Sequence, residues 1–230
     1  MTSGWTKDHP SETAEDPVTV AATRSHQPDL STASLRAPYP GKRMFDLSVV
    51  AVLSIPAGVL GGLAALAVKL EDGGPVLFRQ ERVGTGGRPF RVLKLRTMTH
   101  GQPNPVFPDP TRITRVGRFL RRLSLDELPQ LVNVVRGDMS IVGPRPTLAY
   151  QVVRYTPEQR GRLSVRPGLT GLAQVNGRNN LAWADRILLD LEYIRSQSLG
   201  LDLRLLLRSV RVVFSSDASG HPVEDPLAKP

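Results

Sequence analysis

The longest apolar stretch of the chain is an uncharged run of 22 residues, 47–68, with Arg43 before it and Lys69 directly after it. As a helix it would be about 33 Å long, close to the thickness of the bilayer hydrocarbon. Pro56, in the middle of the run, has no backbone N–H to donate. The Ser54 hydroxyl can bond a backbone group that is left without its helical partner. We therefore predict a membrane-associated helix broken at Ser54 and Pro56. It is either a kinked span or, as basic residues at both ends favour, a re-entrant helix with both ends cytosolic. The alternative is a buried helix of a soluble protein.

An extended pattern follows this helix. Residues 76–78 and 90–96 flank the glycine-rich segment 84–87, and apolar and polar residues alternate along the second run. This pattern predicts a small β-hairpin, in which Lys94 and Arg96 share one strand face. A phosphate-binding loop is the other reading of the glycines, but the Gly-Lys-Ser/Thr ending of such loops is missing.

Three further helices are predicted by a period of 3.6 residues. In 112–123, apolar residues fall on one arc and arginines opposite, which suits an anionic lipid interface; a solvated arginine face is the alternative. Residues 185–198 and 199–214 read as two helices joined near Gly200. The second carries a narrow stripe of arginines on an otherwise apolar cylinder. The predicted fold class is therefore α+β and mostly helical, with the hydrophobic helix, the small hairpin and interfacial amphipathic helices.

Composition separates this core from two tails. Residues 1–41 and 215–230 show no hydrophobic period, and we expect both to be disordered. The chain has a net charge of +9, and each tail carries −2, so 42–214 carries +13. Such a charge attracts an anionic partner, such as lipid headgroups, nucleotide phosphates or nucleic acid. Cysteine is absent, which excludes disulfides and thiolate metal sites.

The candidate chemistry centres on the adjacent carboxylates Asp126 and Glu127. The spacing of Ser124 and Glu127 matches a helix capping box, so capping is the plain alternative to catalysis. Pro129 fits the first turn of a helix that starts at Asp126. In either case the carboxylates lie at a helix N-terminus, which favours anions and can hold a phosphate nearby.

Carboxylates alone would repel a phosphate, and the basic residues Lys94, Arg96, Arg145 and Arg166 can compensate. Arg145 stands between two prolines, which limits its backbone freedom and suits bidentate phosphate binding; a surface turn is the alternative. A divalent cation, Mg²⁺, held by Asp126 and Glu127 could bridge to substrate phosphate.

A second candidate segment, 166–179, combines three glycines with polar side chains. Glycines let a backbone approach a ligand closely, although a structural loop with tight turns has the same composition. Its candidate ligand-binding residues are Arg166, Gln174, Asn176 and Arg178.

Taken together, these motifs resemble the bacterial sugar transferase family, the monotopic phosphoglycosyl transferases, over residues 42–214. Each motif alone is weak, but this many in one order is specific. In chain order they are Lys42-Arg43-x-Phe45-Asp46, Pro75-Val76-x-Phe78-x-Gln80-x-Arg82-Val83-Gly84, Lys94-x-Arg96-Thr97-Met98, Ser124-Leu125-Asp126-Glu127-Leu128-Pro129-Gln130, Asn133, Gly137-Asp138-Met139-Ser140, Val142-Gly143-Pro144-Arg145-Pro146, Arg166-Pro167-Gly168-Leu169-Thr170-Gly171, Gln174-Val175-Asn176-Gly177-Arg178 and Asp190-x-x-Tyr193.

The resemblance implies transfer of a sugar-1-phosphate from a UDP-sugar to a polyprenyl phosphate, with release of UMP. It makes Asp126 the nucleophile of a covalent phosphosugar intermediate, and Glu127 a metal partner or a base. It makes Lys94 and Arg145 phosphate-binding residues, and the segment containing Arg178 a nucleotide-sugar loop. It also implies a plasma-membrane enzyme with Mg²⁺ as cofactor and its catalytic domain on the cytoplasmic face.

We accordingly divide the chain into a tail (1–41), the membrane-associated helix (42–72), the catalytic domain (73–214) and a second tail (215–230). Two rival classes stay open at this point. A membrane-tethered nucleic-acid-binding protein would explain the charge, but stacking aromatics are not interleaved with the basic residues, so we expect no nucleic-acid partner. A membrane scaffold without activity would leave Asp126 and Glu127 as a helix cap.

Overall fold

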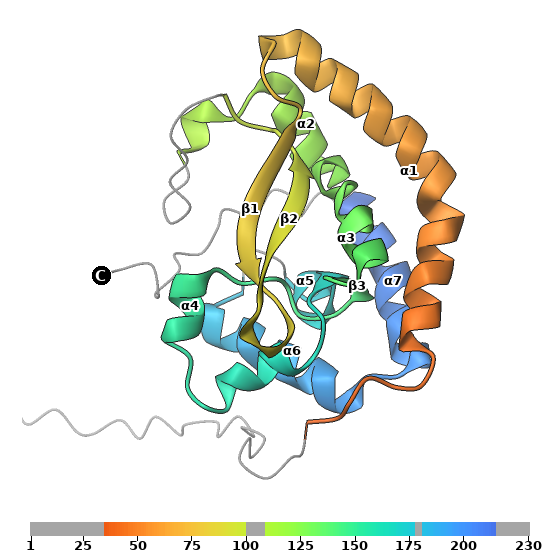
Figure 1. Cartoon of the computed structure of the whole chain (residues 1–230), viewed down its shortest axis with the longest axis vertical. Coiled ribbons are helices and arrows are strands. Elements are labelled where there is room, and N and C mark those ends of the chain that lie inside the picture. Colours follow the sequence, from red (N-terminus) through yellow and green to blue (C-terminus); the bar gives the residue numbers. More distant parts are fainter. Residues whose placement is uncertain (1–34, 100–108, 178–180, 215–230) are drawn as a thin grey trace, which may run out of the picture. The chain divides into compact units, whose positions relative to one another are not determined.

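A computed structural model describes residues 35–99, 109–177 and 181–214, and the predicted tails lie outside these residues except for 35–41. Within the described residues, helices dominate and the two sheets have two strands each, so the mostly helical α+β class is confirmed (Figure 1). The elements are α1 (Lys42–Asp72), β1 (Leu77–Val83), η1 (Thr85–Gly87), β2 (Pro89–Leu95), η2 (Pro110–Arg112), α2 (Arg115–Arg122), η3 (Leu125–Glu127), α3 (Gln130–Arg136), β3 (Ser140–Val142), α4 (Ala149–Val153), η4 (Gln159–Ser164), β4 (Gly168–Thr170), α5 (Leu172–Val175), α6 (Trp183–Ser196) and α7 (Leu199–Phe214), where η denotes a 3₁₀ helix.

Helix α1 is continuous from end to end. It lies between Gly41 and Gly73, whose positive φ values (85° and 71°) turn the chain at either end. Pro56 lies inside the helix, and Ser54 Oγ donates to Ala51 O at 2.7 Å. The predicted break at Ser54 and Pro56 is therefore not an interruption of the helix. Instead α1 curves along its length, which a helix can do while losing only the one amide that proline lacks (Figure 1).

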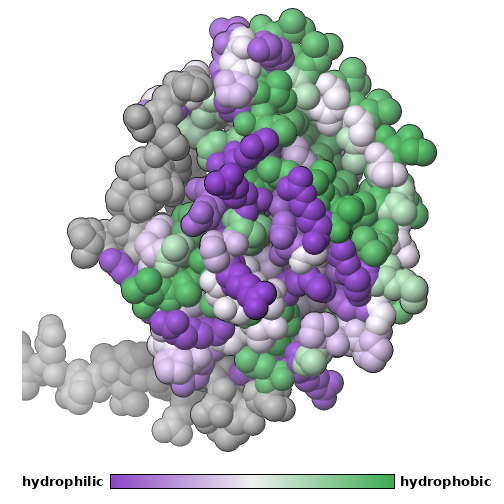
Figure 2. Space-filling model, in the orientation of Figure 1, coloured by the Kyte–Doolittle hydropathy of each residue, from purple (hydrophilic) through white to green (hydrophobic). Residues whose placement is uncertain are grey.

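The apolar surface of α1 is turned outward. Val52, Ile55 and Leu70 are each more than three-quarters exposed, at 77%, 79% and 76%. Of the most apolar 18-residue window of α1, only 11% is buried, and the helix is long and apolar enough to cross a membrane. Figure 2 shows apolar side chains along the edge where α1 runs in Figure 1. The alternative of a buried helix in a soluble core does not describe α1.

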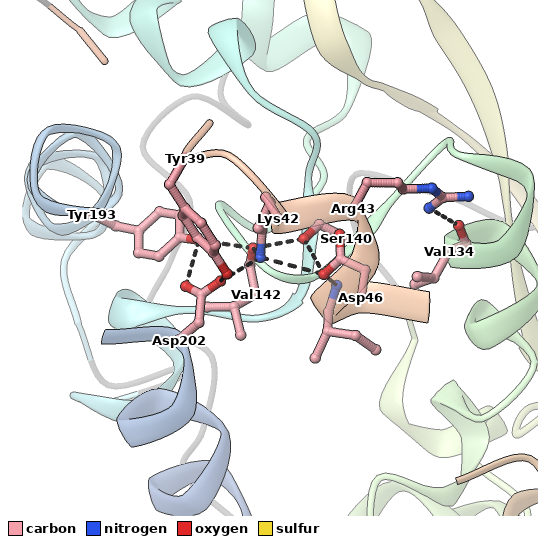
Figure 3. A network of polar contacts seen from close by, with 10 residues as sticks. Tyr39, Lys42, Arg43, Asp46, Val134, Ser140, Val142, Tyr193 and Asp202 are labelled. Atoms are coloured by element: carbon pink, nitrogen blue, oxygen red, sulfur yellow. Dashed lines mark hydrogen bonds and ion pairs between the residues drawn. The ribbon is translucent and has the colours of Figure 1, made fainter. Parts of the chain in front are cut away.

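The N-terminal end of α1 is fixed to the rest of the domain by a buried polar network (Figure 3). Lys42 Nζ donates to Asp202 Oδ2 of α7 at 2.6 Å and to Val142 O at 3.0 Å. Asp46 Oδ1 lies 3.3 Å from Lys42 Nζ and accepts from Ser140 Oγ at 2.9 Å. One lysine therefore serves two carboxylates that are fully buried.

Tyrosine hydroxyls complete this network around Asp202. Tyr193 OH donates to Asp202 Oδ1 at 2.8 Å, and Tyr39 OH donates to Asp202 Oδ2 at 2.9 Å. Burial, together with the nearby carboxylate of Asp202, raises the pKa of both tyrosines, so each hydroxyl keeps the proton that it donates.

The C-terminal end of α1 is fixed to the same domain. Asp72 pairs with Arg96, which follows β2. Glu71 Oε1 accepts from Arg115 N at 2.8 Å and from Val116 N at 3.1 Å, so it caps the N-terminus of α2. Both ends of α1 are thus held by one globular body.

The predicted hairpin is confirmed. Strands β1 and β2 pair antiparallel, with Phe78 opposite Lys94 and Arg82 opposite Phe90. Because the alternation along a strand has a period of two, Gln80, Arg82 and Lys94 share one face of the hairpin. Fully buried Asn133 of α3 bonds the edge of β2: its Oδ1 accepts from Leu93 N at 3.1 Å and its Nδ2 donates to Arg91 O at 2.8 Å.

The chain leaves the hairpin, passes through segment 100–108 and returns to α2. The departing and returning strands are bonded to each other: Thr99 N donates to Arg112 O at 2.8 Å and Thr114 N to Thr97 O at 3.2 Å. Thr114 caps α2 by accepting from Gly117 N at 2.9 Å. The amphipathic helix predicted over 112–123 is confirmed as α2, three residues shorter at its start.

The remaining core is built around β3 and β4. These two short strands pair in parallel, with Ser140 opposite Gly168 and Val142 opposite Thr170. Helices α6 and α7, both predicted from their period, pack on this side of the domain. The largest fully buried side chains of this core include Met139, Ile141, Ile187, Leu191, Tyr193 and Ile194.

Candidate active site

Asp126 and Glu127 lie in the 3₁₀ turn η3, between α2 and α3. Ser124, which precedes this turn, has a positive φ of 56° and makes no side-chain cap bond, so the predicted capping box is not formed. Pro129 instead stands at the cap of α3, one residue before the helix begins at Gln130. The carboxylates therefore do not serve as caps, and that alternative fails.

Glu127 joins two cations from distant parts of the chain. Lys94 Nζ of β2 lies 2.6 Å from Glu127 Oε1, and Arg145 Nη2, from the loop after β3, lies 3.0 Å from the same oxygen. Burial alone would raise the pKa of Glu127, but these two charges and their hydrogen bonds hold it well below its usual range. Glu127 stays ionised, and its Oε2 takes part in neither bond.

Asp126 is more deeply buried than Glu127, whose side chain is 17% exposed, but its oxygens are less engaged. It is 8% exposed, and within the described residues no hydrogen bond engages its oxygens. Burial raises its pKa above the ordinary aspartate value, helped by the adjacent Glu127 charge, while Lys94, Arg121 and Arg145 oppose the rise. A carboxylate with free lone pairs and cations close by is suited to attack a phosphorus atom.

The donor set fits Mg²⁺ only in part. Among the residues that the structure describes, no cluster of three or more His, Cys, Asp or Glu side chains could enclose a metal ion. Two carboxylates with free oxygens, Asp126 and Glu127 Oε2, match the usual protein share of a Mg²⁺ site that is completed by substrate phosphate and water.

The structure brings together four of the predicted site residues, Lys94, Asp126, Glu127 and Arg145, and places Arg96 elsewhere. Arg96 is buried against Asp72 at the end of α1. It lies after the last paired residue of β2, where the chain meets α1 instead of η3.

The residues predicted for nucleotide-sugar binding are bound locally in the structure. Arg166 Nε donates to Gly137 O at 3.0 Å, and exposed Asn176 donates to Leu172 O at 2.8 Å. Both amide atoms of Gln174 are buried without a partner in the described part of the chain. Arg178 lies outside the described residues. The role of this segment stays a prediction.

Three arginines near the site were not assigned a role from the sequence. Arg121 Nε donates to Thr97 Oγ1 at 2.8 Å and its charge acts on Asp126. Arg82 could have been found, because the hairpin register puts it on the face of Lys94. Arg162 carries no sequence signal, since it lies in an irregular 3₁₀ segment.

Comparison with known proteins agrees with this geometry. The family described as "Bacterial sugar transferase" matches residues 38–216 of the chain. The chain therefore belongs to the bacterial sugar transferase family, and it is a transferase.

Individual relatives are similar over about three-quarters of the chain. The "Uncharacterized sugar transferase EpsL" of Bacillus subtilis is 44% identical over 76% of this chain and 88% of its own length. The "UDP-glucose:undecaprenyl-phosphate glucose-1-phosphate transferase" of Caulobacter vibrioides is 47% identical over 76% of this chain and 70% of its own. A protein of the same printed name from Escherichia coli is 40% identical over 77% of this chain, but only 41% of its own length is matched.

Proposed function

We propose that this enzyme moves a sugar-1-phosphate from a UDP-sugar to polyprenyl phosphate through a covalent intermediate on Asp126. The observation that carries the proposal is the contrast between the two carboxylates. Glu127 is held by Lys94 and Arg145, whereas Asp126 makes no hydrogen bond to any residue that the structure describes and lies in the field of the same cations. The printed names of the Caulobacter and Escherichia coli relatives supply the substrate class and make UDP-glucose the first substrate to test.

The reaction has two displacement steps. In the first, an Asp126 oxygen attacks the sugar-bearing phosphorus of the UDP-sugar. An acyl-phosphate bond forms, the bond to the bridging oxygen breaks, and UMP leaves with that oxygen. In the second, an oxygen of polyprenyl phosphate attacks the same phosphorus, and the Asp126 carboxylate is released as the lipid diphosphate sugar forms.

The charges around the site support this chemistry. Arg145, with about half of its side chain exposed, can bind phosphate oxygens while it still contacts Glu127. The lowered pKa of Glu127 makes it a poor base and favours the metal-partner role for it. Mg²⁺, held by Asp126 and Glu127, would supply neutralisation of the phosphate charge.

The two fixed ends of α1 support a proposal for the membrane arrangement. A straight span would put its two ends on opposite sides of the bilayer, yet Lys42 and Asp72 are both held by the same globular body. We infer that both ends of α1 lie on one face of the membrane, with its exposed apolar side in the lipid, and that this face is cytoplasmic, where nucleotide sugars are available. The chain has no cysteine, so single-cysteine variants can test this. Ala37→Cys and Glu81→Cys, exposed on either side of α1, should both label with a membrane-impermeant maleimide from the cytoplasmic side. Labelling of the two from opposite sides would refute it.

The test of the mechanism is intact mass spectrometry of detergent-solubilised protein incubated with UDP-glucose and other UDP-sugars. Wild-type protein should gain the mass of one sugar phosphate and release UMP. Asp126→Asn should gain none, because an amide is not a comparable nucleophile. Asp109→Asn, a change at an exposed loop aspartate, is the matched control and should label normally. An adduct on Asp126→Asn would remove Asp126 from the role.

The proposed metal has its own test. Chelation with EDTA should abolish adduct formation, and added Mg²⁺ should restore it. Undiminished adduct formation in EDTA would leave charge neutralisation to Lys94 and the arginines alone.

A further inference from the structure

The loop that carries Arg145 is held through its carbonyl oxygens. Arg145 stands between Pro144 and Pro146, which have no backbone N–H, so the loop has few donors with which to fix itself. Four consecutive carbonyls accept hydrogen bonds from elsewhere: Pro144 O from Gly168 N at 2.8 Å, Arg145 O from Arg162 at 3.3 Å, Pro146 O from Arg82 at 3.3 Å, and Thr147 O from Val83 N at 2.9 Å.

The two central bonds come from guanidinium groups, and one of these is built into the core. Arg162 is 5% exposed, its Nη2 lies 2.5 Å from Asp190 Oδ2, and its Nη1 donates to Tyr155 OH at 2.5 Å. Its guanidinium also lies 5.6 Å from the ring centres of Tyr155 and Trp183. A guanidinium fixed on so many sides presents its Nη2 to Arg145 O at a defined position.

The second guanidinium approaches from the hairpin. Arg82 Nε and Nη2 both donate to Gln80 Oε1, at 3.1 and 2.6 Å, which leaves Nη1 for Pro146 O. Burial and the nearby Arg145 charge lower the pKa of Arg82 to about 10, so it remains a cation at neutral pH. Arg82 therefore donates to the Arg145 loop although the like charge of the Arg145 guanidinium is nearby.

These contacts end on the carbonyls of Arg145 and of the residue that follows it. Rotation of either peptide would swing the Arg145 side chain away from Glu127 and from a phosphate bound beside Asp126. Loss of that phosphate contact would remove binding energy for the substrate and so raise KM.

We propose that Arg82 and Arg162 are positioning residues, which act on the reaction by fixing the two peptides that follow Arg145. This inference rests on the proposed function, in which Arg145 binds a substrate phosphate. It assigns roles to two arginines that contact no other member of the site directly.

The test is a double-mutant cycle with steady-state kinetics of UMP release. Arg162→Lys keeps a positive charge beside Asp190 but loses the planar fork, and Arg82→Lys does the same on the hairpin. Each should raise the KM for the UDP-sugar by about 10-fold with a smaller change in kcat, since loss of phosphate binding raises KM without slowing a correctly bound substrate. In an Arg145→Ala background each should have less than about a 2-fold further effect, because coupled residues are non-additive.

Arg112→Lys is the matched control, because Arg112 also donates to a carbonyl, that of Thr99, but at the base of segment 100–108. It should leave KM unchanged. Thermal melts report whether each variant is folded; Arg82→Lys, on the partly exposed hairpin, provides the cycle if Arg162→Lys does not fold.

Two results would overturn the inference. One is that each lysine variant raises KM by the same factor in the Arg145→Ala background as in the wild type. The other is a fall in kcat at unchanged KM, which loss of active protein would give. A wild-type enzyme that turns over no UDP-sugar refutes the proposed function instead, so the two failures are distinguishable.

Discussion

Replacing Lys42 by methionine should be among the most damaging changes outside the active site. Methionine has a similar length and keeps the apolar contacts, so the change removes the charge and little else. Two carboxylates, Asp46 and Asp202, then remain fully buried without a cation. Their remaining donors are Ser140, the backbone of Ile141 and two tyrosine hydroxyls, which cannot neutralise two charges.

The size of the effect follows from this burial. Removing one partner of a buried ion pair costs about 3–5 kcal/mol, because the other charge is left uncompensated. In a domain of this size each kcal/mol lowers Tm by roughly 2–4 °C, which makes the expected fall about 6–20 °C. A neighbouring arginine gives the matched control. Within the described ranges, Arg43 donates only to the carbonyls of Val134 and Val135, so Arg43→Met should cost about 1 kcal/mol.

The assay is thermal unfolding of the purified protein in one detergent, with all variants at the same concentration. A second change makes the argument sharper. Asp46 Oδ2 has no hydrogen-bond partner in the part of the chain that the structure describes, so Asp46→Asn can keep the Oδ1 bonds, lose one charge and place its amide nitrogen at the Oδ2 position. Added to Lys42→Met, it should recover part of the lost Tm. A difference of about 2 °C in Tm corresponds to at most about 1 kcal/mol. If the Tm of Lys42→Met lies within about 2 °C of that of the Arg43→Met control, the buried-charge argument is refuted.

Two other predictions address the site and its scaffold. Because Asp126 must be ionised to attack and burial raises its pKa, adduct formation should fall as pH drops through that pKa; Lys94→Met should move this acid limb to higher pH, since the Lys94 charge lowers the Asp126 pKa. Gly117→Ala should destabilise the protein, because a Cβ there overlaps the backbone of Thr97, whereas Gly62→Ala in α1 meets no atom and should be tolerated.

Each of these has a clear contrary outcome. The acid limb is measured as initial adduct rate against pH, and a limb that stays in place in Lys94→Met contradicts the electrostatic coupling. The glycine pair is compared by Tm, and equal values for Gly117→Ala and Gly62→Ala contradict the close packing of α2 on the chain at Thr97.

Periodicity predicted the elements that are long enough to show it. The runs that became α1, α2, α6 and α7 carry several turns each, and the hairpin alternates over seven residues. Strands β3 and β4 have three residues each, and β3 is buried at every position, so neither is long enough to show alternation; their parallel pairing could not be predicted.

The sequence predicted which residues form the site better than it predicted the contacts that hold them. The need to balance charge predicted basic residues beside the carboxylates, and the structure shows Glu127 paired with both Lys94 and Arg145. The capping box, the alternative to catalysis, is not formed, because Ser124 lies in the left-handed region and makes no side-chain cap bond. The destination of Arg96 was missed as well, since its partner at the end of α1 is 24 residues away along the chain.

The paired backbone at the base of segment 100–108 has a practical consequence. Thr99 is hydrogen-bonded to Arg112, and Thr97 to Thr114, so the backbone is paired where the chain enters and leaves this segment. Lengthening the segment beyond this pairing raises the free energy of loop closure only slowly, by about 0.6 kcal/mol for each doubling of length. A fluorescent or affinity module inserted between 100 and 108 should therefore leave Lys94 on one side and Asp126 on the other undisturbed.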